Sequence, residues 1–270
     1  MKVRAPAPST CVDVIGTNCM KAPTKTTRRR RSDVKPTGKS QRESLSFADR
    51  LVALADDPTQ RKGERTRARL KAAAARLLES GGYRDMRVTD INENADVSNA
   101  LFYVYFPNKE KITQEVMTEF LDVLFAHLPR DSAPATIEEA IYRANLDYVQ
   151  RFAANPGLMR CLLQFGDEIA EFEKLWRERN GRWIERAVKR LAREPDLKVK
   201  SVAEIWSATA ALGMMMDGIL RLIYVEREPK TREHARTIAP DEYRLALFLT
   251  RLWIRALFAR EMAWSPAGSK

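Results

Sequence analysis

The stretch that most constrains the fold is residues 88–112, which has the pattern of two short helices joined by a tight turn. Thr89 can cap the first helix, with Asp90 near the helix start, where the helix dipole favours negative charge. Asp96 stands where the chain must turn, and aspartate is one of the few non-glycine residues that tolerate a left-handed backbone conformation. Ser98 can then cap the second helix. This pattern predicts a helix-turn-helix.

The second of these helices, residues 99–106, carries large apolar or aromatic residues in unbroken succession. A single helix face cannot bury all of them. Phe102 and Phe106, four residues apart, fit the core side. The others should point partly outward, which favours contact with a partner. They are Leu101, Tyr103, Val104 and Tyr105.

A third helix is predicted directly after this one. Pro107 ends the preceding helix and Asn108 can cap the next. Lys109 then stands in a first helical turn, where its positive charge opposes the helix dipole. That position suits a lysine that shares the positive helix end with an incoming phosphate.

Ten residues of this region, at matching spacing, resemble the DNA-binding signature of the TetR family of bacterial transcriptional regulators. They are Ile91, Ala95, Val97, Ser98, Phe102, Tyr103, Phe106, Pro107, Lys109 and Glu110. The likeness covers about residues 65–112. Three positions depart from the family pattern: Asp96 stands where glycine is usual, Ala100 where glycine or another small residue is usual, and Asn92 where alanine is usual.

The resemblance implies an all-α fold, with an N-terminal three-helix DNA-binding domain and a larger helical domain for ligand binding and dimerisation. It also implies a homodimer on a palindromic double-stranded DNA operator, acting as a repressor that a small apolar effector releases. Contacts to base edges and thymine methyls are expected from Asn99, Ala100, Leu101 and Tyr105. Contacts to phosphates are expected from Thr89, Ser98, Tyr103 and Lys109.

Charge is concentrated near the N-terminus. The net charge of +11 favours an anionic partner, and residues 1–42 alone hold 11 Lys or Arg against 2 Asp. This segment is rich in Pro, Ser and Thr, so we expect a disordered basic tail. Its densest run is Arg28, Arg29, Arg30 and Arg31. The run is either a solvated charge cluster or an arm along the DNA backbone, and a tail acting alone would make the chain a ligand-independent architectural DNA-binding protein or a membrane-surface protein.

Helical periodicity continues along the chain and predicts about nine helices and no strand. After the tail we expect a short helix or linker at 43–60, the helix-turn-helix domain at 61–110, the effector and dimerisation domain at 111–262, and a tail at 263–270. The helix predicted from residue 61 begins with a basic cluster, of which one or two members should contact phosphates. The cluster is Arg61, Lys62, Arg65, Arg67 and Arg69.

In the second domain, most of the apolar stripes are read as core. The resemblance implies an effector pocket between these helices, mostly apolar with a few polar groups that a ligand can satisfy. The residues expected to line it are Phe120, Tyr148, Phe165, Trp176, Asn180, Trp183, Met216 and Asp217. Tryptophans 176 and 183, the FYVYFP run and a tryptophan in the last helix also resemble a mycobacterial member of the family.

The last two predicted helices, 202–226 and 240–260, are apolar on more than one narrow face. The surplus predicts a two-fold interface, which the family builds from these helices. The residues expected there are Trp206, Ile219, Phe248 and Leu252.

An enzyme finds little support in the sequence. The two histidines, His127 and His234, lie far apart without metal-ligand spacing, and there is no glycine-rich phosphate loop. The cysteines at 11, 19 and 161 predict no disulfide framework, which fits a reducing cytoplasm. No apolar run is expected to reach the ~18 residues of a membrane span. We therefore expect a cytoplasmic, nucleoid-associated protein with no cofactor, no metal and no membrane partner.

Overall fold

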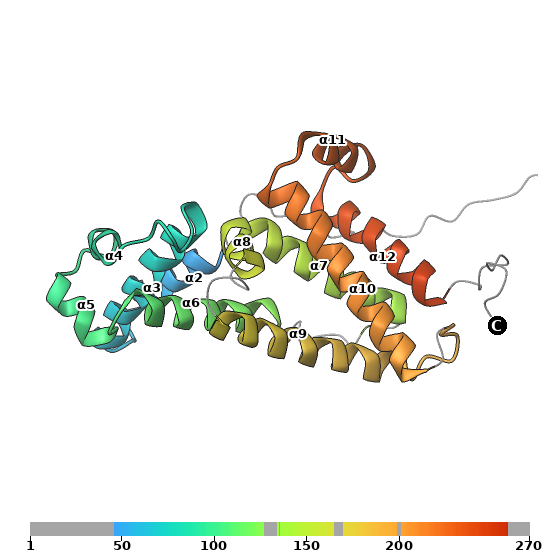
Figure 1. Cartoon of the computed structure of the whole chain (residues 1–270), viewed down its shortest axis with the longest axis horizontal. Helices are drawn as coiled ribbons and strands as arrows, with labels where there is room; N and C mark the ends of the chain where they lie inside the picture. Colours follow the sequence, from blue (N-terminus) through green and yellow to red (C-terminus); the bar gives the residue numbers. More distant parts are fainter. Residues whose placement is uncertain (1–45, 127–133, 135, 165–169, 199–200, 259–270) are drawn as a thin grey trace, which may run out of the picture. The chain divides into compact units, whose positions relative to one another are not determined.

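The computed structural model describes residues 46–126, 134, 136–164, 170–198 and 201–258 (Figure 1). These residues all belong to one compact unit, are largely helical and contain no strand, which confirms the all-α prediction. The elements are α2 (Phe47–Asp56), α3 (Lys62–Ser80), α4 (Val88–Ala95), α5 (Asn99–Tyr105), α6 (Lys109–Leu124), α7 (Ile137–Ala154), α8 (Pro156–Gln164), α9 (Ala170–Leu191), α10 (Val202–Leu220), the π-helical η2 (Arg221–Val225), α11 (Pro229–Ile238) and α12 (Glu242–Phe258). The predicted tails at 1–42 and 263–270 lie outside the described residues.

The helix-turn-helix forms for the local reasons expected from the sequence. Asp96 adopts the left-handed conformation, with φ of 52°, after the end of α4. The Ser98 side chain caps α5 by accepting a hydrogen bond from the backbone N–H of Leu101, at 3.2 Å. Asn108 caps α6 in the same way, accepting from Lys111 at 2.8 Å. These three predictions are confirmed.

The prediction that Thr89 caps α4 is wrong. The helix begins two residues earlier than a cap at Thr89 requires, at Val88, and Arg87 occupies the cap position. The Asp90 carboxylate accepts the backbone N–H of Arg87 at 3.1 Å. Because an acid three residues after the cap can satisfy that N–H, α4 does not need a hydroxyl cap at Thr89.

Helix α11 was not predicted from the sequence. Its residues are mostly charged or polar and none is buried, so no apolar stripe marks it. The local cap explains it instead, since Pro229 stands in the first turn and the Glu228 carboxylate accepts the backbone N–H groups of Lys230 and Thr231.

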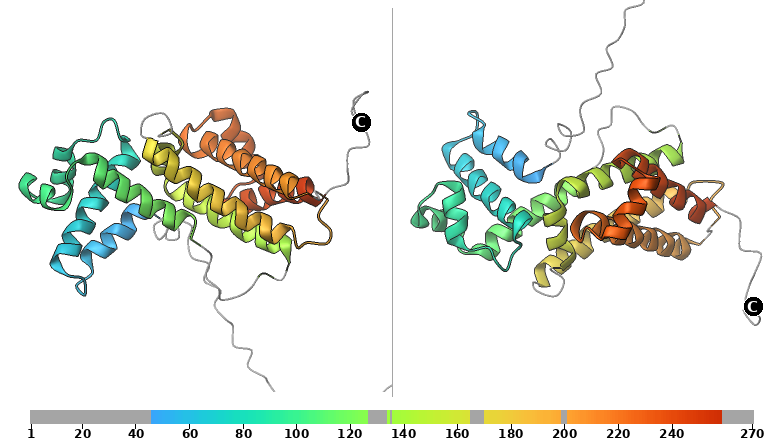
Figure 2. Two further views of the ribbon diagram at one scale, coloured as in Figure 1. Left: turned by 60° about the horizontal axis from the view of Figure 1, so that its bottom comes forward. Right: turned by 90° about the horizontal axis from the view of Figure 1, so that it is seen from above.

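The remaining helices pack around a second part of the core (Figures 1 and 2). Helix α12 packs on α7, and α9 packs on both α6 and α10. Helices α10 and η2 run on as one apolar helix, Val202–Val225. The prediction that no apolar run approaches the length of a membrane span is therefore wrong, because this helix is long and apolar enough by length and composition. That is weak grounds for a membrane partner, since core helices of soluble proteins pass the same test.

Helix α8 is joined to the end of α3 by the carboxylate of Glu79. Its two oxygens accept the backbone N–H groups of Gly157 and Leu158, at 2.7 and 2.8 Å. These N–H groups belong to the first turn of α8 and have no partner within the helix. Burial raises the pKa of Glu79, while the two N–H groups and Arg160 lower it.

The same junction leaves no room for a side chain at Gly157. A Cβ placed there would lie 2.0 Å from the carbonyl oxygen of Glu79. Two other contacts fix this region: the Asn155 side chain accepts the backbone N–H of Phe47 at 2.7 Å, and the Cys161 thiol lies 3.6 Å from the carbonyl oxygen of Leu78. Helix α8 is thus held against α3, and Asn155, the residue just before α8, is held against the start of α2.

We predict that Gly157→Ala destabilises the protein by about 1–3 kcal/mol, because the added methyl group must push α8 away from backbone atoms. The matched control is Gly181→Ala, a helical glycine of α9 whose added Cβ would meet no atom within 4 Å. That variant should be neutral or slightly more stable. Thermal or urea unfolding measures both. Equal stability of Gly157→Ala and the wild type would show that the close approach of α3 and α8 is not a constraint.

Candidate DNA-binding surface and ligand cavity

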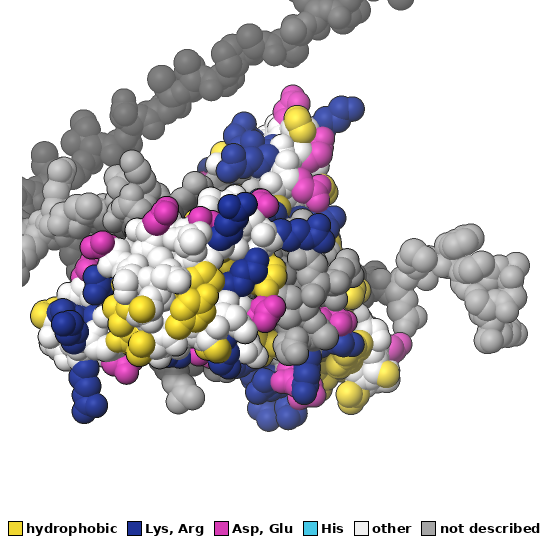
Figure 3. All heavy atoms as spheres, turned by 60° about the vertical axis from the view of Figure 1, so that its left-hand side comes forward, with side chains coloured by type: hydrophobic (Ala, Val, Ile, Leu, Met, Phe, Trp, Pro, Cys, Tyr) yellow, Lys and Arg dark blue, Asp and Glu magenta, His cyan; other side chains and the backbone are white. Residues whose placement is uncertain are grey.

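One side of α5 is buried against the rest of the domain, and the opposite side is exposed to solvent. Phe102 and Phe106 are fully buried, as predicted. The opposite side leaves large apolar groups in solvent, with Leu101, Tyr103 and Val104 exposed by 37%, 53% and 75%. Figure 3 shows hydrophobic side chains gathered on this end of the protein, with Lys and Arg among them. An exposed, rigidly held helix of this kind can enter a major groove.

The structure brings most of the predicted DNA-contacting residues to this surface. Thr89, Ser98, Asn99 and Ala100 are exposed, together with Leu101 and Tyr103. Tyr105 is only partly exposed, and a Cβ added at Gly63, near the start of α3, would lie 3.5 Å from its hydroxyl oxygen. Arg28, Arg29, Arg30 and Arg31 lie outside the described residues.

Lys109 has internal partners that the sequence did not predict. Its amine donates to the carbonyl oxygens of Tyr83 and Met86, at 3.2 and 3.1 Å, and lies 4.4 Å from the centroid of the Tyr83 ring. The amine therefore holds the segment between α3 and α4. A lysine has three N–H donors, so one remains beyond these two hydrogen bonds.

The basic cluster at the start of α3 divides into two kinds of residue. Arg67 is engaged inside the protein: it pairs with Glu115 at 2.6 Å, donates to the carbonyl oxygen of Tyr105 and lies 4.5 Å from the centroid of the Phe106 ring. Arg61, Lys62 and Arg69 are exposed, and Arg65 is half-buried. Arg67 thus already has internal partners, and the exposed cations Arg61, Lys62 and Arg69 are the better phosphate contacts of this cluster.

Asn92, which stands where the TetR signature usually has alanine, links the two helices of the helix-turn-helix. It is buried, and its amide donates to the side-chain oxygen of Asn99 at 3.1 Å. The polar replacement therefore ties α4 to the start of α5, while the side-chain oxygen of Asn92 is buried without a hydrogen-bond partner among the described residues. Asn99 keeps its amide N–H groups for other partners.

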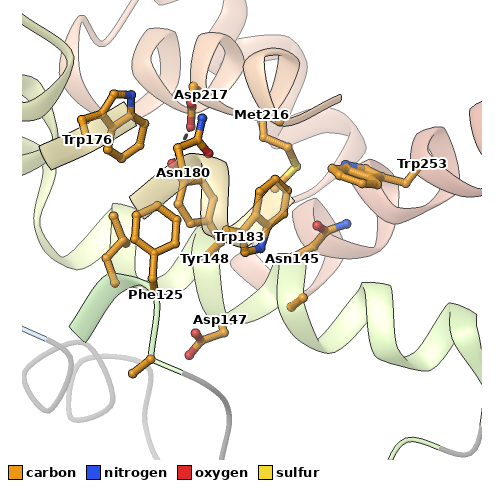
Figure 4. Close-up of a pocket in the computed structure, with 14 residues that line it drawn as sticks. Phe125, Asn145, Asp147, Tyr148, Trp176, Asn180, Trp183, Met216, Asp217 and Trp253 are labelled. Atoms are coloured by element: carbon orange, nitrogen blue, oxygen red, sulfur yellow. Dashed lines mark hydrogen bonds between the residues drawn. The ribbon is translucent and has the colours of Figure 1, made fainter. Parts of the chain in front are cut away.

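A cavity of about 190 Å³ lies among α7, α9, α10, α12 and the end of α6 (Figure 4). Six of the eight residues predicted for an effector pocket line it: Tyr148, Trp176, Asn180, Trp183, Met216 and Asp217. The placement of Phe120 is wrong, because Phe120 is buried against Phe47, with ring centroids 5.6 Å apart, and does not line the cavity. Phe165 lies outside the described residues.

Several cavity residues were not predicted from the sequence, among them Phe125, Asn145, Asp147 and Trp253. Asn145 and Asp147 stand close to Tyr148 on α7, so helical spacing around that tyrosine could have found them. Trp253 belongs to α12, whose apolar residues were assigned to a dimer interface. Its ring packs edge-on against Trp183, with centroids 6.2 Å apart.

Two carboxylates lie at the cavity and differ in their partners. Asp147 pairs with Arg151 on the same helix, at 2.9 Å. Asp217 instead accepts a hydrogen bond from the Tyr148 hydroxyl. Burial raises the pKa of Asp217 to about 6, against the lowering effect of that hydrogen bond. Burial, followed by the charge of Asp217, raises the pKa of Tyr148 well above its ordinary value.

The outer sides of α10 and α12 carry the apolar surplus predicted from the sequence. Trp206 is 47% exposed, and Ile219, Phe248 and Leu252 are half-buried. Only 22% of the most apolar window of Val202–Val225 is buried within the chain. This helix therefore presents a largely uncovered apolar surface.

Comparisons with known proteins agree with this architecture. A family model described as "Bacterial regulatory proteins, tetR family" matches residues 70–116, which include the helix-turn-helix. The chain is 22% identical over 200 residues to the HTH-type transcriptional regulator EthR of Mycolicibacterium smegmatis, covering 73% of this chain and 88% of that protein. It is 39% identical over 59 residues to the uncharacterized HTH-type transcriptional regulator YdgC of Bacillus subtilis, covering 22% of this chain and 30% of YdgC.

The fold is also similar to that of a solved structure, the fatty acid degradation regulator FadR from Bacillus halodurans. The TM-score is 0.51 at 19% identity, over 72% of this chain and 97% of that one. Together, the helix-turn-helix geometry and the family match identify residues 70–116 as a DNA-binding domain of the TetR type, and the likeness to EthR over most of both chains supports a TetR-family transcriptional regulator.

Proposed function

We propose that this regulator acts as a homodimeric repressor, bound to a palindromic operator and released from it by a small, mostly apolar ligand. The observation that carries the proposal is the path of α6. Its first turn, at Lys109, holds the segment that leads into the helix-turn-helix, and its last residue, Leu124, lines the cavity together with Phe125 and Ala126. One helix therefore connects the DNA-binding surface with the ligand cavity.

On DNA, we assign α5 to the major groove. The exposed apolar side chain of Leu101 suits a thymine methyl group, and the free amide N–H groups of Asn99 suit acceptors on base edges. The hydroxyls of Thr89, Ser98 and Tyr103 suit phosphate oxygens, and the exposed cations at the start of α3 add charge for the backbone. Lys109 keeps one donor for a phosphate while its other two hold the protein together.

Release of the repressor from its operator depends on the distance between the two α5 helices of the dimer. The half-sites of a palindrome lie about one helical turn, ~34 Å, apart, so both α5 helices of a dimer must match that separation. A ligand that fits only a conformation with another separation shifts the population away from the DNA-bound form. Two routes lead from the cavity to the DNA-binding surface. One is α6 itself; the other runs through α7, which lines the cavity and packs on α8, and then through the Glu79 junction between α8 and α3. Such a regulator works in the cytoplasm, where bacterial DNA lies.

We predict different effects for two exposed residues of α5. Tyr103→Phe should weaken binding to all duplexes alike, by roughly 2- to 10-fold, because it removes one neutral hydrogen bond to phosphate. Leu101→Ala should instead change which operator is preferred, because it alters a contact to base edges. Titrations against the operator and against two single-base variants of it measure both. A changed preference in Tyr103→Phe, together with an unchanged one in Leu101→Ala, would contradict these roles.

We also predict that Leu252→Arg is monomeric and loses most of its operator affinity, because the arginine would bury an unpaired charge in both subunits. Trp206→Arg tests the same interface from α10 at a residue already 47% exposed in one chain, so its effect does not depend on damage to the core. Thr237→Arg, on the exposed side of α11, is the matched control and should remain dimeric. Sedimentation gives the assembly state and a mobility-shift titration gives the affinity. Folded, dimeric and tightly binding forms of both interface variants would place the interface elsewhere.

A further inference from the structure

Asp217 is an acid that its surroundings leave without an opposite charge. It lies on α10 in a mainly apolar stretch, and its carboxylate accepts the Tyr148 hydroxyl. Among the cavity-lining residues in the described part of the chain, none is Lys, Arg or His. A buried charge without a partner is costly, so an unpaired carboxylate facing a cavity favours a ligand of opposite charge.

The rings around the cavity suit the same kind of ligand. Figure 4 shows Trp176 and Asn180 near Asp217, and Phe125 packs on Trp176 with ring centroids 5.8 Å apart. Aromatic faces attract cations through the ring quadrupole, most strongly for tryptophan. A cation held by Asp217 would therefore lie among aromatic groups as well.

A second, independent feature also points to a ligand in this cavity. Trp253 is 4% exposed and lines the cavity, and its indole N–H has no partner among the described residues. In Figure 4 the indole nitrogen lies on the side of the ring that faces Met216 and Trp183. Buried polar groups are nearly always hydrogen-bonded, so this unsatisfied donor favours a ligand that carries an acceptor on its body; an ammonium group cannot accept this N–H, so the feature does not bear on the ligand's charge.

We propose that the effector is a small amine, whose ammonium group lies against Asp217 and whose apolar body packs between the tryptophans. This rests on the proposed function, in that the cavity is taken as the effector site. Size restricts the body, because about 190 Å³ is only somewhat larger than a 150 Å³ cavity that holds one benzene ring. Asp147 is not the counter-ion, since Arg151 already neutralises it.

The test compares three soluble probes of similar size and different charge by calorimetry on the full chain at pH 8. They are 2-phenylethylamine, 2-phenylethanol and 3-phenylpropanoate. The amine should bind about tenfold or more tightly than the alcohol, because a hydrogen bond to a charged group is among the stronger ones. The carboxylate should bind most weakly.

The variant that isolates the counter-ion is Asp217→Asn. It should reduce the affinity for the amine by about tenfold or more and leave the affinity for the alcohol within a few-fold, since the Tyr148 hydroxyl can still donate to the amide oxygen. Asp147→Asn is the matched control, because it removes a cavity carboxylate that has its own arginine. Its effect on the amine should be clearly smaller.

Several outcomes would overturn the inference. Equal or tighter binding of the alcohol or the carboxylate would leave the cavity as an effector site but exclude an amine. An amine preference that survives Asp217→Asn would place the cation elsewhere, and failure of all three probes to bind would exclude ligands of this class. Failure of the proposed repressor function would be seen in a separate measurement, in which the ligand-free protein would show no sequence-specific DNA binding.

Discussion

The carboxylate of Glu79, at the end of α3, is the contact on which the rest of the structure depends. It satisfies the free N–H groups of α8, and the close approach at Gly157 makes the junction rigid. Helix α3 packs on α4 and α6 along its length, so it carries the helix-turn-helix at the same time. A ligand that moves α7, which lines the cavity and packs on α8, must therefore strain α3 or move it through this junction, because packed elements do not deform freely.

The exposed apolar side of α10 could be covered either by a bilayer or by a second subunit. The helix Val202–Val225 is apolar enough for a bilayer and is mostly uncovered within the chain. Asp217 stands near its middle, paired with Tyr148 across the cavity, and a carboxylate at bilayer depth is expensive. The second subunit that we propose would cover this surface and would leave the cavity on the inner side of the helix.

A structural feature could be predicted from the sequence where neighbouring residues determine it, and could not where its partners are distant in the chain. The caps at Ser98 and Asn108 and the turn at Asp96 act within a few residues, and all three were predicted. The internal roles of Lys109 and Arg67 could not be, because their partners lie 23 to 48 residues away in the chain. Helix α11 escaped prediction because it lacks a buried stripe. Six of the fourteen residues that line the cavity were predicted, among them the two polar residues that interrupt apolar stripes, Asn180 and Asp217. Phe120 was misplaced because a buried phenylalanine fits a core and a cavity wall equally well.

The central claim is that a folded, two-fold helix-turn-helix surface reads sequence, with the basic tail as at most an accessory. The most direct measurement is selection of bound duplexes from a random pool, followed by a nuclease footprint on the enriched sequence. The account predicts one enriched palindrome, with half-sites about one helical turn apart, and a bounded footprint over it. Binding without enrichment, with protection spread evenly along any duplex, would contradict it and would favour a tail-driven architectural protein instead.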